Sequence, residues 1–139
     1  MMLVTIHVGI LLITAWNIFK ADHLGFKWIR GSILKLKEEE VMKYHERVFF
    51  GLILMVITGF LLFAPKGVRL LASNAFYIKM IFVGALLLNS FAINRLSKIS
   101  IKNTFAELSF KQKLPLIISG GVSTISWLGA FIAAFFLFP

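Results

Sequence analysis

The chain has 139 residues, of which 59% are hydrophobic and 15% charged, and its formal net charge is +9. A soluble domain of this length cannot bury so much apolar surface, so the composition excludes an ordinary soluble fold. The chain has no cysteine. This excludes disulfides, thiolate metal sites and the thiol chemistry of quinone-linked disulfide oxidases.

Four apolar runs are long enough to cross a bilayer, since a span needs about 20 mostly apolar residues. They cover residues 2–19, 44–64, 75–93 and 114–138. The first run lacks the basic start and the cleavage site of a secretory signal peptide, so we expect it to be kept as a helix. The sequence therefore predicts a single domain of the all-α class, an integral membrane up-down four-helix bundle.

The basic residues gather in two of the three connections. Twelve of them flank or fill the first and third connections, whereas the second has Lys66 and Arg69. This bias predicts that the first and third connections are cytoplasmic and that both termini lie outside. We expect a protein of the bacterial inner (cytoplasmic) membrane whose basic residues contact anionic lipid, with no nucleic-acid partner.

The first connection is long enough to have structure of its own. Ser32 is the predicted N-cap of a helix that merges with the second span near Tyr44. Pro65 is expected to end the second span. Pro115 is expected in the first turn of the fourth, where the missing N–H costs little.

The third connection contains a pattern like a capping box, with Asn103 or Thr104 followed by Glu107. It predicts a short interfacial helix from which Phe105 and Leu108 dip into the headgroup layer. An aromatic belt at the membrane boundaries is expected from Trp16, Trp28, Tyr44 and Tyr77.

One face of the fourth span carries small residues at spacings of four and three. In lipid, helices associate by close backbone approach and by polar contacts, so this stripe is expected to face protein. Gly51 and Gly59 offer similar surfaces on the second span. The stripe consists of Ser119, Ser123, Ser126, Ala130 and Ala133.

Placing a polar group inside a membrane costs free energy, so such groups are the default candidates for function. Glu46 lies at the cytoplasmic start of the second span, and no other acidic residue falls within a predicted span, which disfavours a proton-coupled exporter of the small four-helix type. Lys79 is expected to reach the interface by snorkelling. Asn89 is expected to bond to a neighbouring helix. The full set is His7, Asn17, Lys79 and Asn89, with His23 and His45 at the cytoplasmic boundary.

Histidine is the most informative of these residues because a neutral imidazole ligates both haem iron and copper. His7 lies toward the outer leaflet and His45 at the inner one, so the two are too far apart in depth to share one haem within a chain. His23 and His45 flank the same connection and could meet there. The alternative for all three is a structural role as a polar side chain.

The region between His45 and Asn89 carries a family resemblance. It contains Gly51-Leu52-Ile53-Leu54-Met55-Val56-Ile57-Thr58-Gly59 and Phe76-Tyr77-Ile78-Lys79-Met80. Over roughly residues 1–95 the chain resembles the membrane domain of the copper-resistance D (CopD-like) type, and it is similar to small bis-histidine membrane cytochromes b. Three features of that family match this sequence at His7, Thr58-Gly59 and Lys79. The Met-rich and Cys-containing patterns of dedicated copper relays are missing.

Three functions follow from these residues and from the resemblance. The first is haem b binding through His7, His23 and His45, in a membrane component that transfers electrons. The second is copper or other metal-ion transport, with His7, Lys79 and Asn89 along the path. The third is a non-catalytic scaffold or accessory subunit that forms a homo-oligomer or docks a redox partner. Hydrolytic catalysis is not expected, because no nucleophile, base and carboxylate share one depth.

Overall fold

The computed structural model describes residues 2–137, which are helical and contain no strand. Four of the helices are long and apolar enough to cross a membrane, which confirms the predicted all-α membrane bundle. Residue 138, the predicted end of the fourth span, lies outside the described residues. The elements are α1 (Met2–Ile29), α2 (Glu38–Phe63), the 3-10 turn η1 (Ala64–Lys66), α3 (Gly67–Leu71), α4 (Asn74–Lys102) and α5 (Phe110–Phe135).

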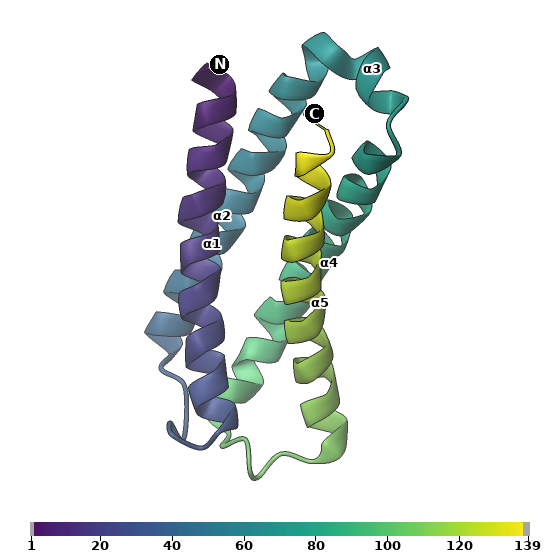
Figure 1. Cartoon of the computed structure of the whole chain (residues 1–139). Coiled ribbons are helices and arrows are strands. Elements are labelled where there is room, and N and C mark those ends of the chain that lie inside the picture. The colour runs from purple at the N-terminus through teal and green to yellow at the C-terminus, as the bar shows by residue number, and fades with distance from the viewer. Residues whose placement is uncertain (1, 138–139) are drawn as a thin grey trace.

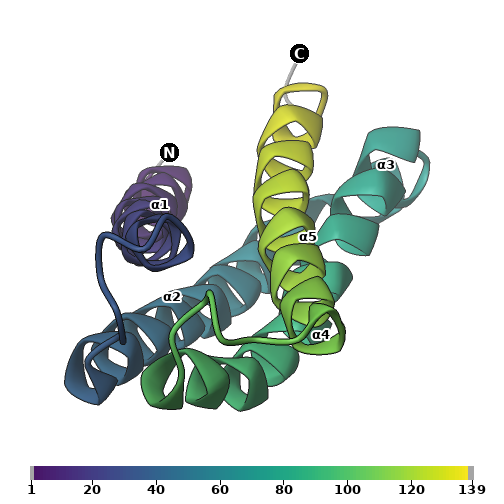
Figure 2. The same ribbon diagram turned by 90° about the horizontal axis from the view of Figure 1, so that it is seen from below.

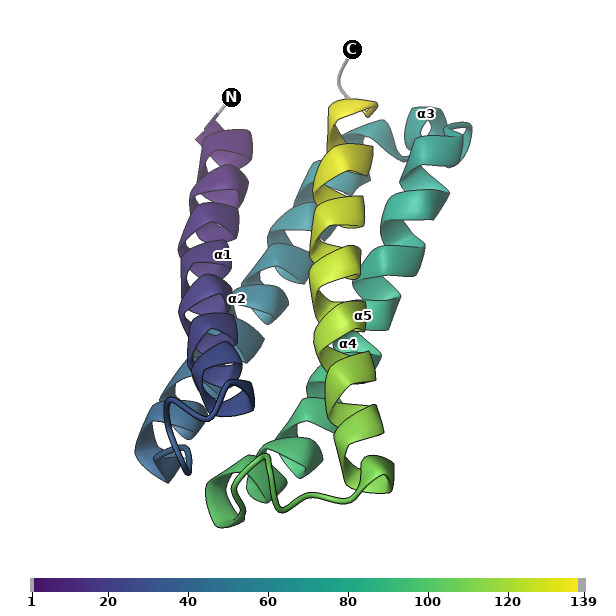
Figure 3. The same ribbon diagram turned by 60° about the horizontal axis from the view of Figure 1, so that its bottom comes forward.

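The four long helices run alternately up and down (Figure 1). The start of α1 and the end of α5 lie at the same end of the bundle as α3, and we call this the terminal end. The opposite end, which we call the basic end, holds the two connections formed by residues 30–37 and 103–109, and Figure 3 brings it forward. That the basic end is cytoplasmic stays a prediction.

The bundle consists of two helical hairpins. In hairpin 1, α1 packs along α2, and in hairpin 2, α4 packs along α5. Between the hairpins, α2 and α4 touch over a much shorter stretch. Figure 2, seen from below, shows α1 and α5 well separated, with α2 passing obliquely beneath them. The two halves of the molecule are therefore packed more closely internally than against each other.

Hairpin 1 depends on a close approach at Gly51. Thr14 of α1 is 2% exposed, and its hydroxyl donates to the carbonyl oxygen of Ile10 at 2.7 Å. A Cβ placed on Gly51 would overlap Thr14 Oγ1. This contact confirms the expected use of a small residue on the second span to bring two backbones together.

We predict that Gly51→Ala destabilises the protein. Overpacking costs about 1–3 kcal/mol, which exceeds the gain of up to about 1 kcal/mol from replacing a helical glycine with alanine. Thermal unfolding in detergent micelles measures the difference. Gly120→Ala is the matched control, because a Cβ there meets nothing within 4 Å. Equal melting temperatures for the two variants would contradict the close approach.

Hairpin 2 is held by the stripe of small residues on α5, all five of which are buried, as predicted. The stripe is covered by the chain's own helices. Asn89 of α4 donates through Nδ2 to the Ser119 carbonyl oxygen at 2.9 Å, and Ser119 Oγ donates to Asn89 Oδ1 at 2.8 Å. The prediction that Asn89 bonds to a neighbouring helix is confirmed.

A double-mutant cycle between Asn89→Ala and Ser119→Ala should show a favourable coupling free energy. In membrane proteins such couplings average about 0.6 kcal/mol and reach about 1.7 kcal/mol. Asn89→Ala should cost more than Ser119→Ala, because the amide keeps its bond to the backbone carbonyl when the hydroxyl is removed. Thr124→Ala is the control, since the Thr124 hydroxyl bonds to Gly120 of its own helix. A coupling no larger than that between Asn89 and Thr124 would contradict this link.

The predicted helix starting at Ser32 is wrong. Gly31, with φ of 74°, ends α1, and the Ser32 N–H donates back to the Lys27 carbonyl oxygen at 2.9 Å. A residue with positive φ followed by such a bond is a typical helix C-terminus. The next helix begins at Glu38, where three successive glutamates stabilise the positive end of the helix dipole.

The third connection forms a turn in place of the predicted interfacial helix. Glu107 accepts a bond from the Thr104 N–H at 3.2 Å, and the side-chain and backbone hydrogen bonds of Thr104 lower the pKa of the Glu107 carboxyl. A complete capping box lies further on, where Ser109 and Gln112 bond each other. Because this box starts α5 at Phe110, Pro115 lies in the second turn and not in the predicted first.

The aromatic belt is only partly as predicted. Trp16 and Tyr77 are 58% and 50% exposed and are free to meet lipid, but Trp28 is 3% exposed and lies inside the protein. Leu108 is 6% exposed, so its predicted headgroup contact is wrong, whereas that of the half-buried Phe105 stays a prediction.

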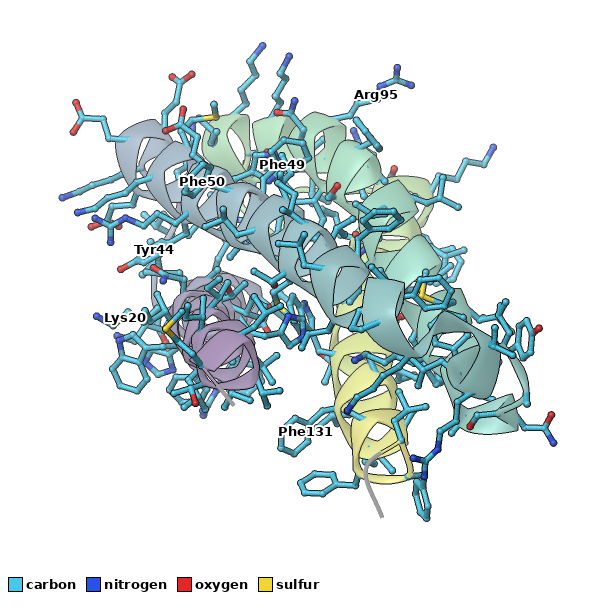
Figure 4. The ribbon with its side chains drawn as sticks, turned by 90° about the horizontal axis from the view of Figure 1, so that it is seen from above. Lys20, Tyr44, Phe49, Phe50, Arg95 and Phe131 are labelled. Carbon is cyan, nitrogen blue, oxygen red and sulfur yellow. The ribbon has the colours of Figure 1, made fainter. Side chains whose placement is uncertain are left out.

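Two charged side chains point outward, away from the helices. Figure 4 shows Lys20 and Arg95 doing so on different sides of the bundle. Lys20 Nζ lies 5.2 Å from the centre of the Trp16 ring, which suits a basic side chain at a membrane boundary.

Candidate functional site

A cavity of about 230 Å³ lies between the two hairpins, in the half of the bundle nearer the basic end. Residues of all four long helices line it, together with Leu36 of the first connection. Most of the lining is apolar. The polar side chains among the lining residues are Asp22, Tyr44, His45, Ser97, Ser100, Ser119 and Ser123.

Asp22 and His45 are the two lining residues that ligate metals well. Asp22 belongs to α1 because that helix continues to Ile29, past the predicted end of the first span at residue 19. An acidic residue therefore lies on the first long helix, three residues past the predicted end of the first span. Asp22, which is exposed, and His45, which is half-buried, both line this cavity, from neighbouring helices.

The register of hairpin 1 places Asp22 and His45 at nearly the same depth. His7 contacts Thr58, and Thr14, seven residues further along α1, contacts Gly51, seven residues back along α2. Continuing this antiparallel register brings Asp22 level with residue 43. At a rise of about 1.5 Å per residue, His45 lies about 3 Å further along the helix axis.

His23 does not share this cavity. Its ring stacks on Phe19 of the same helix, with ring centres 6.4 Å apart, and the side chain is exposed. Ala21, Asp22 and Leu24 line the cavity, and His23 is not among the lining residues. The cavity therefore does not bring His23 and His45 together as predicted. Asp22 is the residue of α1 that lines it together with His45.

A second polar cluster lies toward the terminal end. His7 Nδ1 is 2.6 Å from Thr58 Oγ1, and the Thr58 hydroxyl donates to the Leu54 carbonyl oxygen at 2.8 Å. A hydroxyl has a single hydrogen, so both bonds form when His7 Nδ1 is the donor. His7 Nε2 then keeps a free lone pair. Lys79 of α4 lies near enough for its charge to act on the imidazole.

The three positions that carry the family resemblance lie on three different helices at this cluster, where His7 bonds Thr58 and the charge of Lys79 acts on His7. Asn89 is separate, bonded to Ser119 inside hairpin 2. Asn17 bonds to the Ile13 carbonyl oxygen of its own helix.

A haem held by His7 and His45 of one chain does not fit this arrangement. Thr58, the partner of His7, is about 20 Å along α2 from His45. The described residues also bring no three of the side chains of His, Asp and Glu together. The cavity is smaller than the roughly 300–1,000 Å³ of pockets that enclose small organic ligands.

Haem b binding stays a prediction that an absorbance spectrum tests. A Soret band in the purified protein, after expression with ample haem, would support it. A spectrum without that band would remove haem from the candidates.

Sequence reasoning missed Asp22 as a site residue because hydropathy alone sets the end of the first span too early. A usable signal was present. Thr14, Ala21 and Trp28 recur every seven residues, and each is buried or half-buried, as on the inner face of one continuous helix. Continuing the helix to Trp28 would have placed Asp22 beside that face.

No protein-family model, no curated protein and no solved structure matches the chain. The CopD-like resemblance therefore stays a prediction that rests on the residues quoted for it. The function has to be argued from the cavity and from the cluster around His7.

Proposed function

We propose that this chain is a membrane transport or permeability protein for a metal ion such as copper, and that the ion binds in the cavity between the hairpins. The observation that carries the proposal is that Asp22 of α1 and His45 of α2 line one cavity. A carboxylate oxygen and an imidazole nitrogen are both good ligands for divalent first-row metal ions.

The charge of Asp22 supports the binding of a cation. A metal ion leaving water for an apolar cavity needs compensating negative charge and ligands that replace its hydration shell. Asp22 is the one acidic residue among those lining the cavity. The hydroxyls of Tyr44, Ser97 and Ser100 provide further oxygen atoms in the lining.

The small number of strong ligands suits transport better than storage. Structural metal sites have a complete shell of protein ligands, whereas conduction needs a site that binds the ion weakly enough to let it leave. With two strong ligands in the cavity, water and hydroxyl groups have to complete the coordination. Such an ion exchanges more readily than one in a closed site.

The hairpin architecture supports a route through the molecule. The cavity lies at the boundary between the hairpins, which touch only over a short stretch of α2 and α4. The cluster of His7 and Lys79 lies toward the other end of the bundle. In this proposal the ion enters from the basic end, which we place in the cytoplasm, and His7 Nε2 is the next ligand toward the terminal end.

Metal binding and uptake test this proposal directly. Purified protein in micelles is titrated with Cu²⁺ alone, and proteoliposomes that contain a fluorescent copper chelator report uptake. We expect Asp22→Asn and His45→Gln each to weaken Cu²⁺ binding at least about tenfold, since even the loss of a group that only orients a ligand costs that much. Both variants should also slow uptake.

His23→Gln is the matched control because His23 is the same residue type, adjacent to Asp22, and lies off the cavity. It should bind and take up Cu²⁺ like the unchanged protein. Equal losses in His23→Gln and His45→Gln would show surface binding and refute the cavity site. Uptake no faster than in protein-free liposomes would refute transport.

A further inference from the structure

The first connection, residues 30–37, reaches across from hairpin 1 to hairpin 2, and we call it the strap. The Leu36 N–H donates to the carbonyl oxygen of Ser100, in the last turn of α4, at 3.2 Å. Leu36 and Ser100 both line the cavity. The strap therefore forms part of the cavity wall at the basic end and ties the two hairpins together there.

The end of α4 leaves the Ser100 carbonyl free to accept this bond. The last carbonyl groups of a helix have no partner within it. A continuing helix would use the Thr104 N–H for Ser100, but that N–H donates to Glu107 Oε2 at 3.2 Å. The Ser100 carbonyl oxygen is thus left free to accept the hydrogen bond from the Leu36 N–H of the strap.

Trp28 forms a second tie beside the first. Its Nε1 donates to the Asn103 carbonyl oxygen at 3.1 Å, and its ring meets Phe105 edge-on with centres 5.2 Å apart. Lys113 Nζ lies 5.0 Å from the centre of the Phe105 ring. One aromatic side chain at the end of hairpin 1 is therefore fixed against the turn of hairpin 2.

These ties join the two hairpins to each other, whereas the contacts of Thr14 and Asn89 lie within one hairpin. Two hydrogen bonds and one aromatic pair join the hairpins at the basic end, whereas the chain itself joins them through η1 and α3 at the terminal end. Releasing the ties leaves the contact of Thr14 with Gly51 and the bonds of Asn89 with Ser119 intact. A hollow of about 230 Å³ between residues 28–34 and 104–106 leaves the strap room to move.

We propose that the strap is a gate, which controls access from the basic end to the cavity by making and breaking the bond between Leu36 and Ser100, with Trp28 holding it closed. The inference rests on the proposed function for the identity of the solute. The movement itself is independent of what the cavity binds, so it can be tested without a metal ion.

The absence of native cysteine permits a clean accessibility assay. Ser97 lines the cavity, and Ser97→Cys would carry a single thiol there. The rate at which a polar maleimide labels this thiol in micelles measures how often the cavity opens to water. Leu36→Pro removes the N–H donor of the strap, and Trp28→Phe removes Nε1 while keeping a ring against Phe105.

Both changes should increase the labelling rate by up to about tenfold, the shift that the loss of one net hydrogen bond produces. Leu34→Pro is the control, because it puts proline into the same strap at an exposed position and spares the Leu36 bond. Trp28→Phe is the milder second variant, and its melting temperature shows that the fold is kept.

Faster labelling in Leu36→Pro and Trp28→Phe, with an unchanged rate in Leu34→Pro, supports the gate. Equal rates in all four proteins overturn it, and so does an equal increase in Leu34→Pro. Failure of Cu²⁺ binding together with faster labelling would refute the proposed function while the gate stands. Cu²⁺ binding with unchanged labelling would refute the gate alone.

Discussion

The whole arrangement depends on how helices attract one another in lipid, where burying apolar side chains gives no driving force. Each hairpin solves this with a close backbone approach or a buried polar contact. Hairpin 1 uses Gly51 against Thr14, and hairpin 2 uses Asn89 with Ser119 on a stripe of small residues. The boundary between the hairpins has few such contacts, and the cavity lies there because little else holds that boundary closed.

Polar residues on this boundary separate into two groups along the length of the bundle. Asp22 and His45 face the cavity near the basic end, and His7 with Lys79 lies toward the terminal end. Ser119 belongs to both the cavity lining and the bond with Asn89, so the polar contact that holds hairpin 2 also shapes the cavity. Ser119 thus both stabilises hairpin 2 and lines the cavity.

The sequence predicts the helices well and their ends poorly. Hydropathy measures transfer into lipid, so it detects the apolar middle of a helix but not the turns beyond it, which are set by Gly31 and by the capping box of Ser109. For the same reason, hydropathy did not place Asp22 on the first helix. The bond between Asn89 and a neighbouring helix was predictable because a buried amide has to find a partner. The pairing of Leu36 with Ser100 was not, because backbone bonds between distant segments leave no trace in residue type.

The self-contained packing of each hairpin has a consequence for how the protein is made. Helices leave the ribosome in order, and neither the close approach of α1 to α2 nor the His7–Thr58 bond needs a residue of α4 or α5. The chain can therefore enter the bilayer as two consecutive pairs, each holding its own polar groups away from the acyl chains. Assembly then needs only the docking of two finished halves, which is a step that involves little surface and is easily reversed.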